Sequence, residues 1–394
     1  MREGYLLPED PVEQILDSVR AVFDSWTCPR AITYRNVEGI DDSLGTAATV
    51  QTMVFGNLGD TSGTGVAFSR DPRTGDRGLV GDFLVGAQGE DVVAGTHRTQ
   101  ELPSLADTWP DVWYRLLDAA DTLEHHFADM VDIEFTVERG ELYLLQCRRA
   151  KRSPAAVFRV ALDMANDPGF PVDRTEAVRR CDALIDDPPT ISVSAGTEEP
   201  IVLAEGIAAS PGRASGLLVL DVDDAVTRSA RGESVVLVRR ETSPADVHGM
   251  AAAVGLVTTL GGLVSHAAVV ARSWGLPAVV GVENMELEAG AISAAGHRVE
   301  VGDLLTVDGT SGLVLLGAHG SAETPMPEVA IIASWARTQA DPMASDAALD
   351  DNSAGEGDCL RVISLKGAAD SAAVAIALRA PASDVEPMLR DLTT

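Results

Sequence analysis

His266 stands shortly after two glycines and at the start of an apolar run, which makes its imidazole a candidate nucleophile. Gly261 and Gly262 lack a Cβ, so the backbone there can turn tightly and approach a bulky anion that a side chain would obstruct. An imidazole is largely neutral at cellular pH, and its ring nitrogen can attack phosphorus without a separate general base. These residue types in this order therefore suit the acceptance of a phosphoryl group by histidine.

The residues around His266 predict a helix that Ser265 and His266 open. Ser265 and His266 form its first turn, and apolar residues at helical spacing would hold it against a core. These residues are Ala267, Val270, Ala271 and Trp274. The backbone N–H groups and the positive dipole end of such a helix favour a phosphoryl group beside the histidine. On the residues alone a second interpretation stays open, in which His266 caps a loop or packs in a polar pocket.

A second group of chemically capable residues lies on two predicted strands, 131–137 and 141–146, joined by the turn 138–140. Alternate residues of a strand face the same side, so each strand can offer a pair to one face. The pairs are Asp132 with Glu134, and Gln146 with Arg148. Carboxylate oxygens are hard ligands that suit Mg²⁺, and an arginine fork can neutralise phosphate charge. A solvated strand face is the alternative interpretation of the two acids.

A third candidate is the segment 51–75, in which an apolar stretch leads into a loop rich in Ser, Thr and Gly. Such a loop can bind phosphate through its backbone, but turns of this composition are common, so the signal is weak alone. Two acids in the following run 87–95, Glu90 and Asp91, fit either a phosphate-side position or a plain surface position.

Together these segments resemble the PEP-utilising enzymes, the family of pyruvate, phosphate dikinase and PEP synthase. The run 259–272 is similar to the phosphohistidine signature of that family. The segments 51–75, 87–95, 132–136 and 144–148 resemble pyruvate, phosphate dikinase specifically, and the resemblance covers about residues 1–320.

The resemblance implies a role for each matching residue. His266 would carry the phosphoryl group, and Asp132, Glu134 and Gln146 would hold Mg²⁺ and the nucleotide phosphates. Arg148 would contact phosphate. The residues Met53, Val54 and Phe55 would form the hinge beside adenine. The loop 239–246 would flank the histidine, and Arg272 would steady its domain.

The implied reaction passes a phosphoryl group from ATP to pyruvate. His266 would take the β-phosphoryl group of ATP and release AMP, while the γ-phosphate goes to inorganic phosphate. The phosphohistidine would then phosphorylate pyruvate to PEP. The histidine domain must travel between two sites in this scheme, and we expect it to hinge at linkers near 186–200 and 317–327.

The sequence predicts a multidomain α/β fold of four parts. We expect a partial ATP-grasp nucleotide-binding domain at 1–150, a helical segment and linker at 151–200, a swivelling phosphohistidine domain at 201–318, and a linker with a small helical tail at 319–394. Helices are predicted at 11–26, 110–130, within 154–185 and at 328–337. Strands are predicted at 31–34, 47–55, 65–68, 83–85, 217–220, 235–238, 255–258, 278–280, 304–307 and 313–316.

Several features depart from the family pattern. We expect the chain to lack the N-terminal ATP-grasp half with its triphosphate-covering lysine and arginine, and the barrel that binds pyruvate or PEP. It would then need a partner polypeptide for turnover. The alternative is a non-catalytic binding or regulatory protein derived from the dikinase. Val264 replaces a regulatory threonine, and Asp82 replaces a glutamate, which is expected to weaken a nucleotide contact.

Composition limits the compartment and the partners. The chain has 394 residues, of which 45% are hydrophobic, and a formal net charge of −30. This charge argues against nucleic acid or an anionic membrane as a partner. The apolar region 251–282 is interrupted by glycine, proline and charge, and the first residues lack a signal-peptide pattern, so we expect a soluble cytoplasmic protein. Helical patterns at 359–365, 371–378 and 384–392 predict a small packing element.

Overall fold

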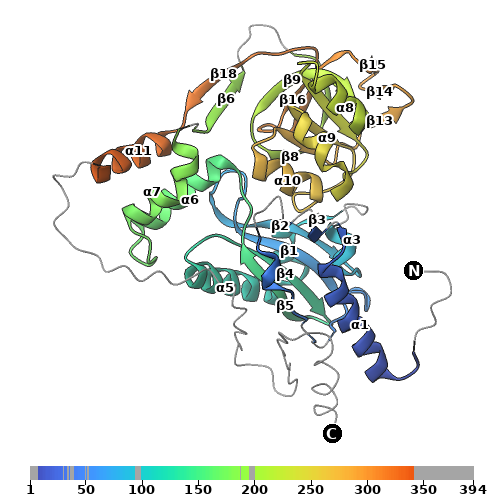
Figure 1. Cartoon of the computed structure of the whole chain (residues 1–394), viewed down its shortest axis with the longest axis vertical. Helices are drawn as coiled ribbons and strands as arrows, with labels where there is room; N and C mark the ends of the chain where they lie inside the picture. The colour runs from blue at the N-terminus through green and yellow to red at the C-terminus, as the bar shows by residue number, and fades with distance from the viewer. Residues whose placement is uncertain are drawn as a thin grey trace. The chain divides into compact units, whose positions relative to one another are not determined.

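The computed structural model describes residues 8–29, 31–32, 35, 40–48, 50, 53–93, 99–186, 188–194 and 200–340 (Figure 1). Two compact units make up the chain, one of Met1–Met53 with Leu349–Thr394 and one of Val54–Ala348. The predicted helical patterns between 359 and 392 lie outside the described residues.

Helix α1 (Pro11–Trp26) is the longest element among the described residues of the first unit and confirms the predicted helix. Asp10 caps it by accepting a hydrogen bond from Val12 N, and its buried Leu16 and Val19 pack with Ala48. The strand predicted at 31–34 is wrong at both of its described residues, which are helical. Pro29 precedes them, and proline suits the first turn of a helix.

The strand predicted at 47–55 is also wrong for its described residues, because the chain there forms no more than an isolated bridge at Ala48. A β-rich apolar run needs a partner strand to form a ladder, and its composition alone does not provide one. Met53, Val54 and Phe55 are irregular instead.

A five-stranded antiparallel sheet begins the second unit, in the order β3-β2-β1-β4-β5. Its strands are β1 (Gly63–Arg70), β2 (Arg77–Val85), β3 (Gln100–Glu101), β4 (Val131–Glu138) and β5 (Glu141–Arg149). The strands predicted at 65–68 and 83–85 and the predicted hairpin are confirmed as parts of this sheet.

Helix α5 (Pro110–Phe127) covers one face of this sheet. Its apolar side packs on alternate sheet residues in one cluster that includes Val112, Leu116, Ala120, Ala67, Phe83, Ile133 and Phe135. The helix ends earlier than predicted because Ala128 adopts a left-handed conformation with φ 48°. The short elements α3 (Gly89–Val93), η2 (Leu102–Ser104) and α4 (Leu105–Thr108) connect the sheet to α5.

Three helices form a separate core, two of them directly after the five-stranded sheet in sequence and one near the end of the described chain. Helices α6 (Pro154–Asn166), α7 (Arg174–Ile185) and α11 (Pro327–Ala340) confirm the predicted helical patterns and bury a common cluster. The two predicted linkers are not independent: β6 (Thr190–Ser194) from the first pairs antiparallel with β18 (Ser321–Pro325) from the second. Figure 1 shows this ribbon beside the helices.

An eight-stranded mixed sheet lies between the two strands of that ribbon in sequence. Its order is β7-β17-β16-β9-β10-β11-β12-β8, and β9 to β12 are parallel. The strands are β7 (Val202–Glu205), β8 (Ile207–Ser210), β9 (Arg213–Val219), β10 (Val235–Arg239), β11 (Gly255–Thr258), β12 (Ala278–Val280), β16 (Leu304–Asp308) and β17 (Leu313–Leu316). All six strands predicted here are confirmed, and β7 and β8 were not predicted.

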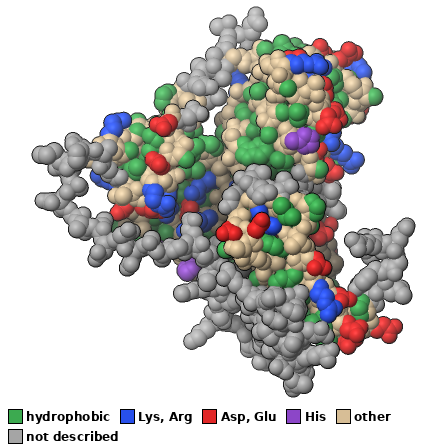
Figure 2. Space-filling model, viewed as in Figure 1, with side chains coloured by type: hydrophobic (Ala, Val, Ile, Leu, Met, Phe, Trp, Pro, Cys, Tyr) green, Lys and Arg blue, Asp and Glu red, His purple; other side chains and the backbone are tan. Residues whose placement is uncertain are grey.

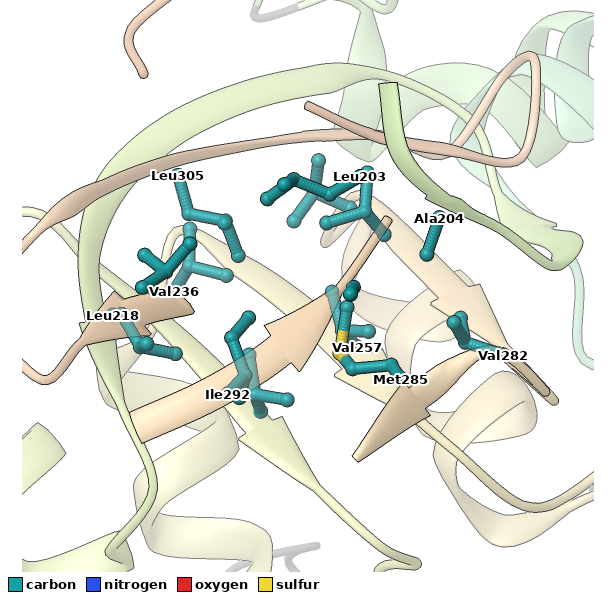
Figure 3. Packing of buried hydrophobic residues seen from close by; sticks show 14 of the residues in the cluster. Leu203, Ala204, Leu218, Val236, Val257, Val282, Met285, Ile292 and Leu305 are labelled. Atoms are coloured by element: carbon teal, nitrogen blue, oxygen red, sulfur yellow. The ribbon is translucent and has the colours of Figure 1, made fainter. Parts of the chain in front are cut away.

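Each face of the mixed sheet buries its own core. One face packs on helices α8 (Val222–Ser229), α9 (Val247–Ala252) and α10 (His266–Trp274). The other face packs on a three-stranded sheet of β13 (Met285–Glu288), β14 (Ala291–Ala294) and β15 (His297–Glu300). Figure 3 shows this second core, where Ile292 and Met285 lie among Val236, Val257 and Leu305.

The charge on the surface and the length of the apolar helices are relevant to the partners that the sequence argued against, nucleic acid and membrane. On the face seen in Figure 2, acidic side chains lie among basic and hydrophobic ones. Within the part of the chain that the structure describes, no helix is long and apolar enough to cross a membrane.

Candidate functional site

His266 occupies the first position of helix α10, within the N-terminal turn where the sequence predicted it. Ser265 is the N-cap and accepts a hydrogen bond from Ala268 N, while its hydroxyl donates to Gly262 O at 2.8 Å. Gly261 has a φ of 105°, a conformation that a side chain would strain. The glycine pair and the serine therefore place the histidine at the start of the helix.

The core anchors of helix α10 are mostly those predicted. Ala267 and Ala271 are buried, and Val270 packs against the same core. The prediction was wrong for Trp274, which is 47% exposed. Trp274 is the last helical residue, and Gly275 turns the chain into a left-handed conformation directly after it. Helical spacing alone does not show where the core ends.

Two loops meet around His266 because β10 and β11 are adjacent parallel strands. Their continuations stay joined, with Thr259 N donating to Arg239 O at 3.1 Å and Leu260 N donating to Arg240 O at 2.8 Å. The loop after β10 then brings Thr242 to the histidine. Ligand sites of α/β sheets commonly form at this carboxyl edge.

Thr242 contacts the imidazole directly. Its Oγ1 lies 3.2 Å from His266 Nδ1, and the threonine is only 8% exposed. A hydroxyl can accept from a protonated Nδ1 or donate to a bare one. In the first arrangement Nε2 keeps its lone pair, which is the form required for nucleophilic attack.

Asp246 orders the same loop. Burial raises the pKa of its carboxyl, but hydrogen bonds from the Ser243 backbone and hydroxyl, together with nearby Arg239 and His266, lower it further, so the net pKa lies below the ordinary value. Asp246 and Ser243 form a reciprocal capping box around the helix η3 (Pro244–Asp246). The carboxylate therefore stays ionised and fixes the loop that carries Thr242.

Arg272 supports the loop that carries His266 through hydrogen bonds to the backbone. It is fully buried and donates hydrogen bonds to Leu263 O at 2.7 Å and Ala209 O at 3.1 Å. Burial lowers the pKa of its guanidinium to about 10. These contacts agree with the structural role expected for it, because both of these hydrogen bonds end on backbone carbonyls of its own domain.

The second group of residues comes together on the five-stranded sheet. Asp132 lies opposite Arg148, and Glu134 lies opposite Gln146, so all four project from the face that α5 leaves uncovered. Arg148 Nε is 2.9 Å from both carboxylate oxygens of Asp132. Burial raises the pKa of Asp132, although Arg148 opposes the shift.

The donor set of this face fits a hard cation. Two carboxylates and one amide oxygen are the kinds of oxygen ligand that Mg²⁺ takes, with water or phosphate oxygens completing its shell. Among the described residues there is no group of three or more His, Cys, Asp or Glu suited to a metal. A cation here would therefore use Gln146 as its third protein ligand.

The predicted adenine hinge is only partly defined. Met53 is 64% exposed and Phe55 is 40% exposed, and Val54 between them is half-buried. Phe55 N donates to Glu138 Oε2 at 2.8 Å, which ties the segment to the end of β4. Exposed apolar side chains are suited to a flat ring ligand.

The loop before β1 lies beside the run 87–91. A Cβ at Gly56 would approach Ala87 O to 2.3 Å, so the two backbones are in close contact. Asp91 accepts a hydrogen bond from Gln88 N and thus caps its own turn. Glu90 is exposed. Asp91 therefore has a structural role in its own turn. For Glu90, a phosphate-side position and a plain surface position both stay open.

Sequence reasoning noted Asp82 only as a departure from the family pattern and missed its contact with the loop that carries His266. Val66 of β1 lies opposite both Asp82 of β2 and Glu134 of β4, so one row runs across four strands from Asp82 to Gln146. Asp82 is 2% exposed, and its Oδ2 accepts a hydrogen bond from Val264 N at 3.1 Å. No local sequence pattern predicts the contact between Asp82 and Val264, which are 182 residues apart in the sequence.

Comparison with known proteins gives two family matches. Residues 5–110 and 113–166 match the pyruvate phosphate dikinase AMP/ATP-binding domain, and residues 231–312 match the mobile domain of PEP-utilising enzymes. The first match contains the five-stranded sheet with Asp132 and Glu134, and the second contains His266.

Individual relatives agree with these matches. The chain is 45% identical over 331 residues to pyruvate, phosphate dikinase of Rhizobium meliloti (strain 1021), covering 80% of this chain and 36% of the relative. It is 44% identical over 319 residues to that of Clostridium symbiosum, with the same coverage. The chloroplastic enzyme of Flaveria bidentis is 43% identical over 340 residues, 85% of this chain and 35% of its own. The chain thus spans about a third of the length of these relatives.

Proposed function

Since the chain belongs to the pyruvate, phosphate dikinase family, we propose that it is a phosphotransferase that passes a phosphoryl group from ATP through His266 towards pyruvate or PEP. The observation that carries this proposal is the hydrogen bond between Thr242 and His266 Nδ1 at the first turn of α10. In this proposal the contact orients the ring, and Nδ1 donates to the hydroxyl, so that Nε2 is left to make the attack. We further propose that 1–150 is a partial ATP-grasp domain and 201–318 a swivelling phosphohistidine domain.

In the proposed first step, Nε2 of His266 attacks the β-phosphorus of ATP. An N–P bond forms, the bond to the α,β-bridging oxygen breaks, and AMP leaves with that electron pair. Nδ1 keeps its proton throughout and donates it in a hydrogen bond to Thr242 Oγ1. The γ-phosphoryl group passes to inorganic phosphate, and the phosphohistidine then transfers its phosphoryl group to the enolate oxygen of pyruvate.

The sheet face is the proposed nucleotide site. Asp132, Glu134 and Gln146 would hold Mg²⁺, which when bound would neutralise charge on the phosphates. Arg148, released from Asp132, has donors for a phosphate oxygen. Phe55 and its neighbours Met53 and Val54 would contact the adenine. Full turnover would also require the other ATP-grasp half and a pyruvate-binding barrel, whether on this polypeptide or on a partner.

Labelling of His266 tests the proposal. The protein is incubated with Mg²⁺, phosphate and ATP, or with Mg²⁺ and PEP, alone and with a complete dikinase whose own phosphocarrier histidine is replaced. An acid-labile, base-stable phosphoryl group is expected on His266 in at least one combination. The matched control is His248→Ala on the neighbouring helix α9, because His248 is exposed and should not affect labelling.

The result also decides the alternative of a non-catalytic protein. One observation favours that alternative: Asp132 is engaged by Arg148 on both oxygens. Absence of label in every combination, or equal label in His266→Ala, would establish the non-catalytic alternative and remove the phosphocarrier proposal.

A further inference from the structure

Arg159 of α6 carries a charge that the proposed reaction does not use. Its Nη1 donates a hydrogen bond at 3.0 Å to Oδ1 of Asp76, in the turn between β1 and β2. Its Nε is 2.6 Å from Oε1 of Glu328, in the first turn of α11. One guanidinium therefore forms ion pairs with two segments that are distant in the sequence, and we call these three residues the ion clip.

The turn between β1 and β2 packs directly on helix α6. Gly75 adopts a φ of 84°, and a Cβ placed on it would lie 2.8 Å from the Cβ of Arg159. At the N-cap of the same helix, Ser153 N donates a hydrogen bond to Pro72 O at 2.9 Å, and the Ser153 hydroxyl donates to Arg73 O. Helix α6 thus holds the turn at two points, one of which is the apolar stem of Arg159.

The Glu328 side of the clip is buried, whereas the Asp76 side is not. Glu328 is 8% exposed, while the side chain of Asp76 is 60% exposed. Among the residues that the structure describes, Arg159 is the one cation that forms an ion pair with Glu328. A buried carboxylate that loses its partner is costly, and an exposed ion pair contributes little. The contact between Arg159 and Glu328 is therefore the energetically important half of the clip.

Helix α11 directly follows one strand of the ribbon that β6 and β18 form. Strand β18 ends at Pro325 and α11 begins at Pro327, so one residue separates them. The other strand, β6, begins at Thr190, shortly after α7 ends at Ile185. Helices α6, α7 and α11 share one buried cluster, so both strands leave from the same helical core. Glu328 thus lies at the root of the ribbon.

We propose that Arg159 is a positioning residue that ties the root of the ribbon to the turn between β1 and β2. The proposal rests on the proposed function for its purpose, because a phosphohistidine domain that swivels must return to the nucleotide sheet in one orientation. Strands β1 and β2 belong to that sheet, so the clip gives the ribbon a fixed origin on the body that carries Asp132 and Glu134. Without the clip, the first turn of α11 and the strand before it are free to shift relative to the sheet.

Hydrogen exchange tests the clip without relying on activity. Mass spectrometry would follow amide exchange at 188–194 and 321–332 in the full chain and in Arg159→Gln, Glu328→Gln and Asp76→Asn. Arg159→Gln leaves Glu328 buried without a cation, so it should accelerate exchange in both segments at least about 10-fold. Glu328→Gln should have a smaller effect in the same segments. Asp76→Asn should have the smallest effect, because this acid is exposed.

Two further variants separate ion pairing from packing. The double variant of Arg159→Gln with Asp76→Asn should exchange no faster than Arg159→Gln alone, since the second change removes a partner that is already lost. Arg159→Lys keeps a charge and most of the stem, but a single ammonium cannot span both acids as the guanidinium fork does. Its exchange should lie between that of Arg159→Gln and that of the unchanged chain.

The matched control is Arg77→Gln. Arg77 of β2 pairs at 2.6 Å with Asp167, the residue that follows α6, so it joins the sheet to the helical core through a residue outside α11. This variant should leave exchange at 321–332 unchanged. Unchanged exchange there in both Arg159→Gln and Glu328→Gln, or equal acceleration in Arg77→Gln, would overturn the proposal.

Chemical labelling distinguishes failure of the clip from failure of the proposed function. Phosphoramidate is a small donor that can phosphorylate a histidine without a nucleotide site. In Arg159→Gln, labelling of His266 by phosphoramidate should equal that of the unchanged chain, because the clip lies outside the histidine domain. The rate of ATP-dependent labelling, in the combination that labels the unchanged chain, should fall at least about threefold and recover in part in Arg159→Lys. An equal ATP-dependent rate would refute the positioning role, whereas absence of ATP label in both proteins removes the proposed function and leaves the exchange result to decide the clip.

Discussion

The hydrogen bond between Thr242 and His266 offers the sharpest test of how the imidazole is held. Thr242→Val removes the hydroxyl but keeps the shape of a side chain that is 8% exposed, so packing changes little. Thr242→Ser is the matched control, because it keeps the hydroxyl and loses only a methyl group.

The size of the effect follows from the single contact that is lost. A neutral hydrogen bond contributes about 0.5–1.5 kcal/mol, and at 3.2 Å this one is of ordinary length. If the bond is kept in the transition state, its loss slows phosphorylation of His266 by about 2- to 13-fold. Loss of the Nδ1–H acceptor also allows the other tautomer, in which Nε2 carries the proton.

The assay is a single-turnover measurement of phosphoryl label on His266, taken across a range of pH. For Thr242→Val we expect a slower rate of labelling throughout the pH range in which the imidazole is neutral. The same ratio to the unchanged chain is expected with phosphoramidate and with ATP, because the defect lies in the histidine itself. Thr242→Ser should retain most of the rate.

Two outcomes would refute this reasoning. A Thr242→Val rate equal to that of the unchanged chain would show that the hydroxyl does not orient the nucleophile. A Thr242→Ser rate as low as that of Thr242→Val would show that the methyl group, and thus packing, is the important feature.

Three further predictions concern charged side chains and Val264. Arg148→Gln removes the guanidinium that contacts both oxygens of buried Asp132. The free energy of unfolding, measured with urea, should therefore fall by up to about 1 kcal/mol at neutral pH. The loss should be smaller in acid, where Asp132 is protonated. Hydrogen bonds from Arg179 and a second arginine lower the pKa of Glu176 from 4.5 to about 2, so its contribution to stability is complete above about pH 4.5 and lost as the pH falls towards 2. The advantage of the unchanged chain over Glu176→Gln in urea midpoint should therefore shrink across that range, and a constant difference would contradict it. Val264→Thr places a hydroxyl in an apolar cluster and should cost about 1–3 kcal/mol in the unfolding free energy, and absence of a cost would show that this residue is exposed in solution.

Local patterns in the sequence predicted the elements that hold the candidate site residues. The serine before His266 is an N-cap, and the alternation in 131–148 matches the register that pairs Asp132 with Arg148 and Glu134 with Gln146. Both features depend on neighbours within a few residues or on one tight hairpin. Such short-range signals can be read directly from spacing.

Features that depend on distant partners could not be read in this way. The row from Asp82 through Val66 to Glu134 requires the pairing of β2, β1 and β4, which no local spacing specifies. The strands β13, β14 and β15 were missed because Met285–Glu288 and its neighbours are short and largely polar on one side. The strand expected at 47–55 failed for the converse reason, since its apolar residues have no ladder partner among the described residues.

The pairing of β6 with β18 determines how the histidine domain is attached. Chain residues 194 and 321 are register partners, so the segment between them leaves and re-enters through the same two-stranded ribbon. Two tethers that are hydrogen-bonded to each other bend together, which leaves far fewer directions of rotation than two separate flexible linkers would allow. If the domain swivels as proposed, this attachment limits it to an arc, and the effective concentration of His266 at any site on that arc is correspondingly high. The ribbon would then be the shared hinge of the proposed motion, and changes in its length or pairing would redirect the histidine without altering a residue of either site.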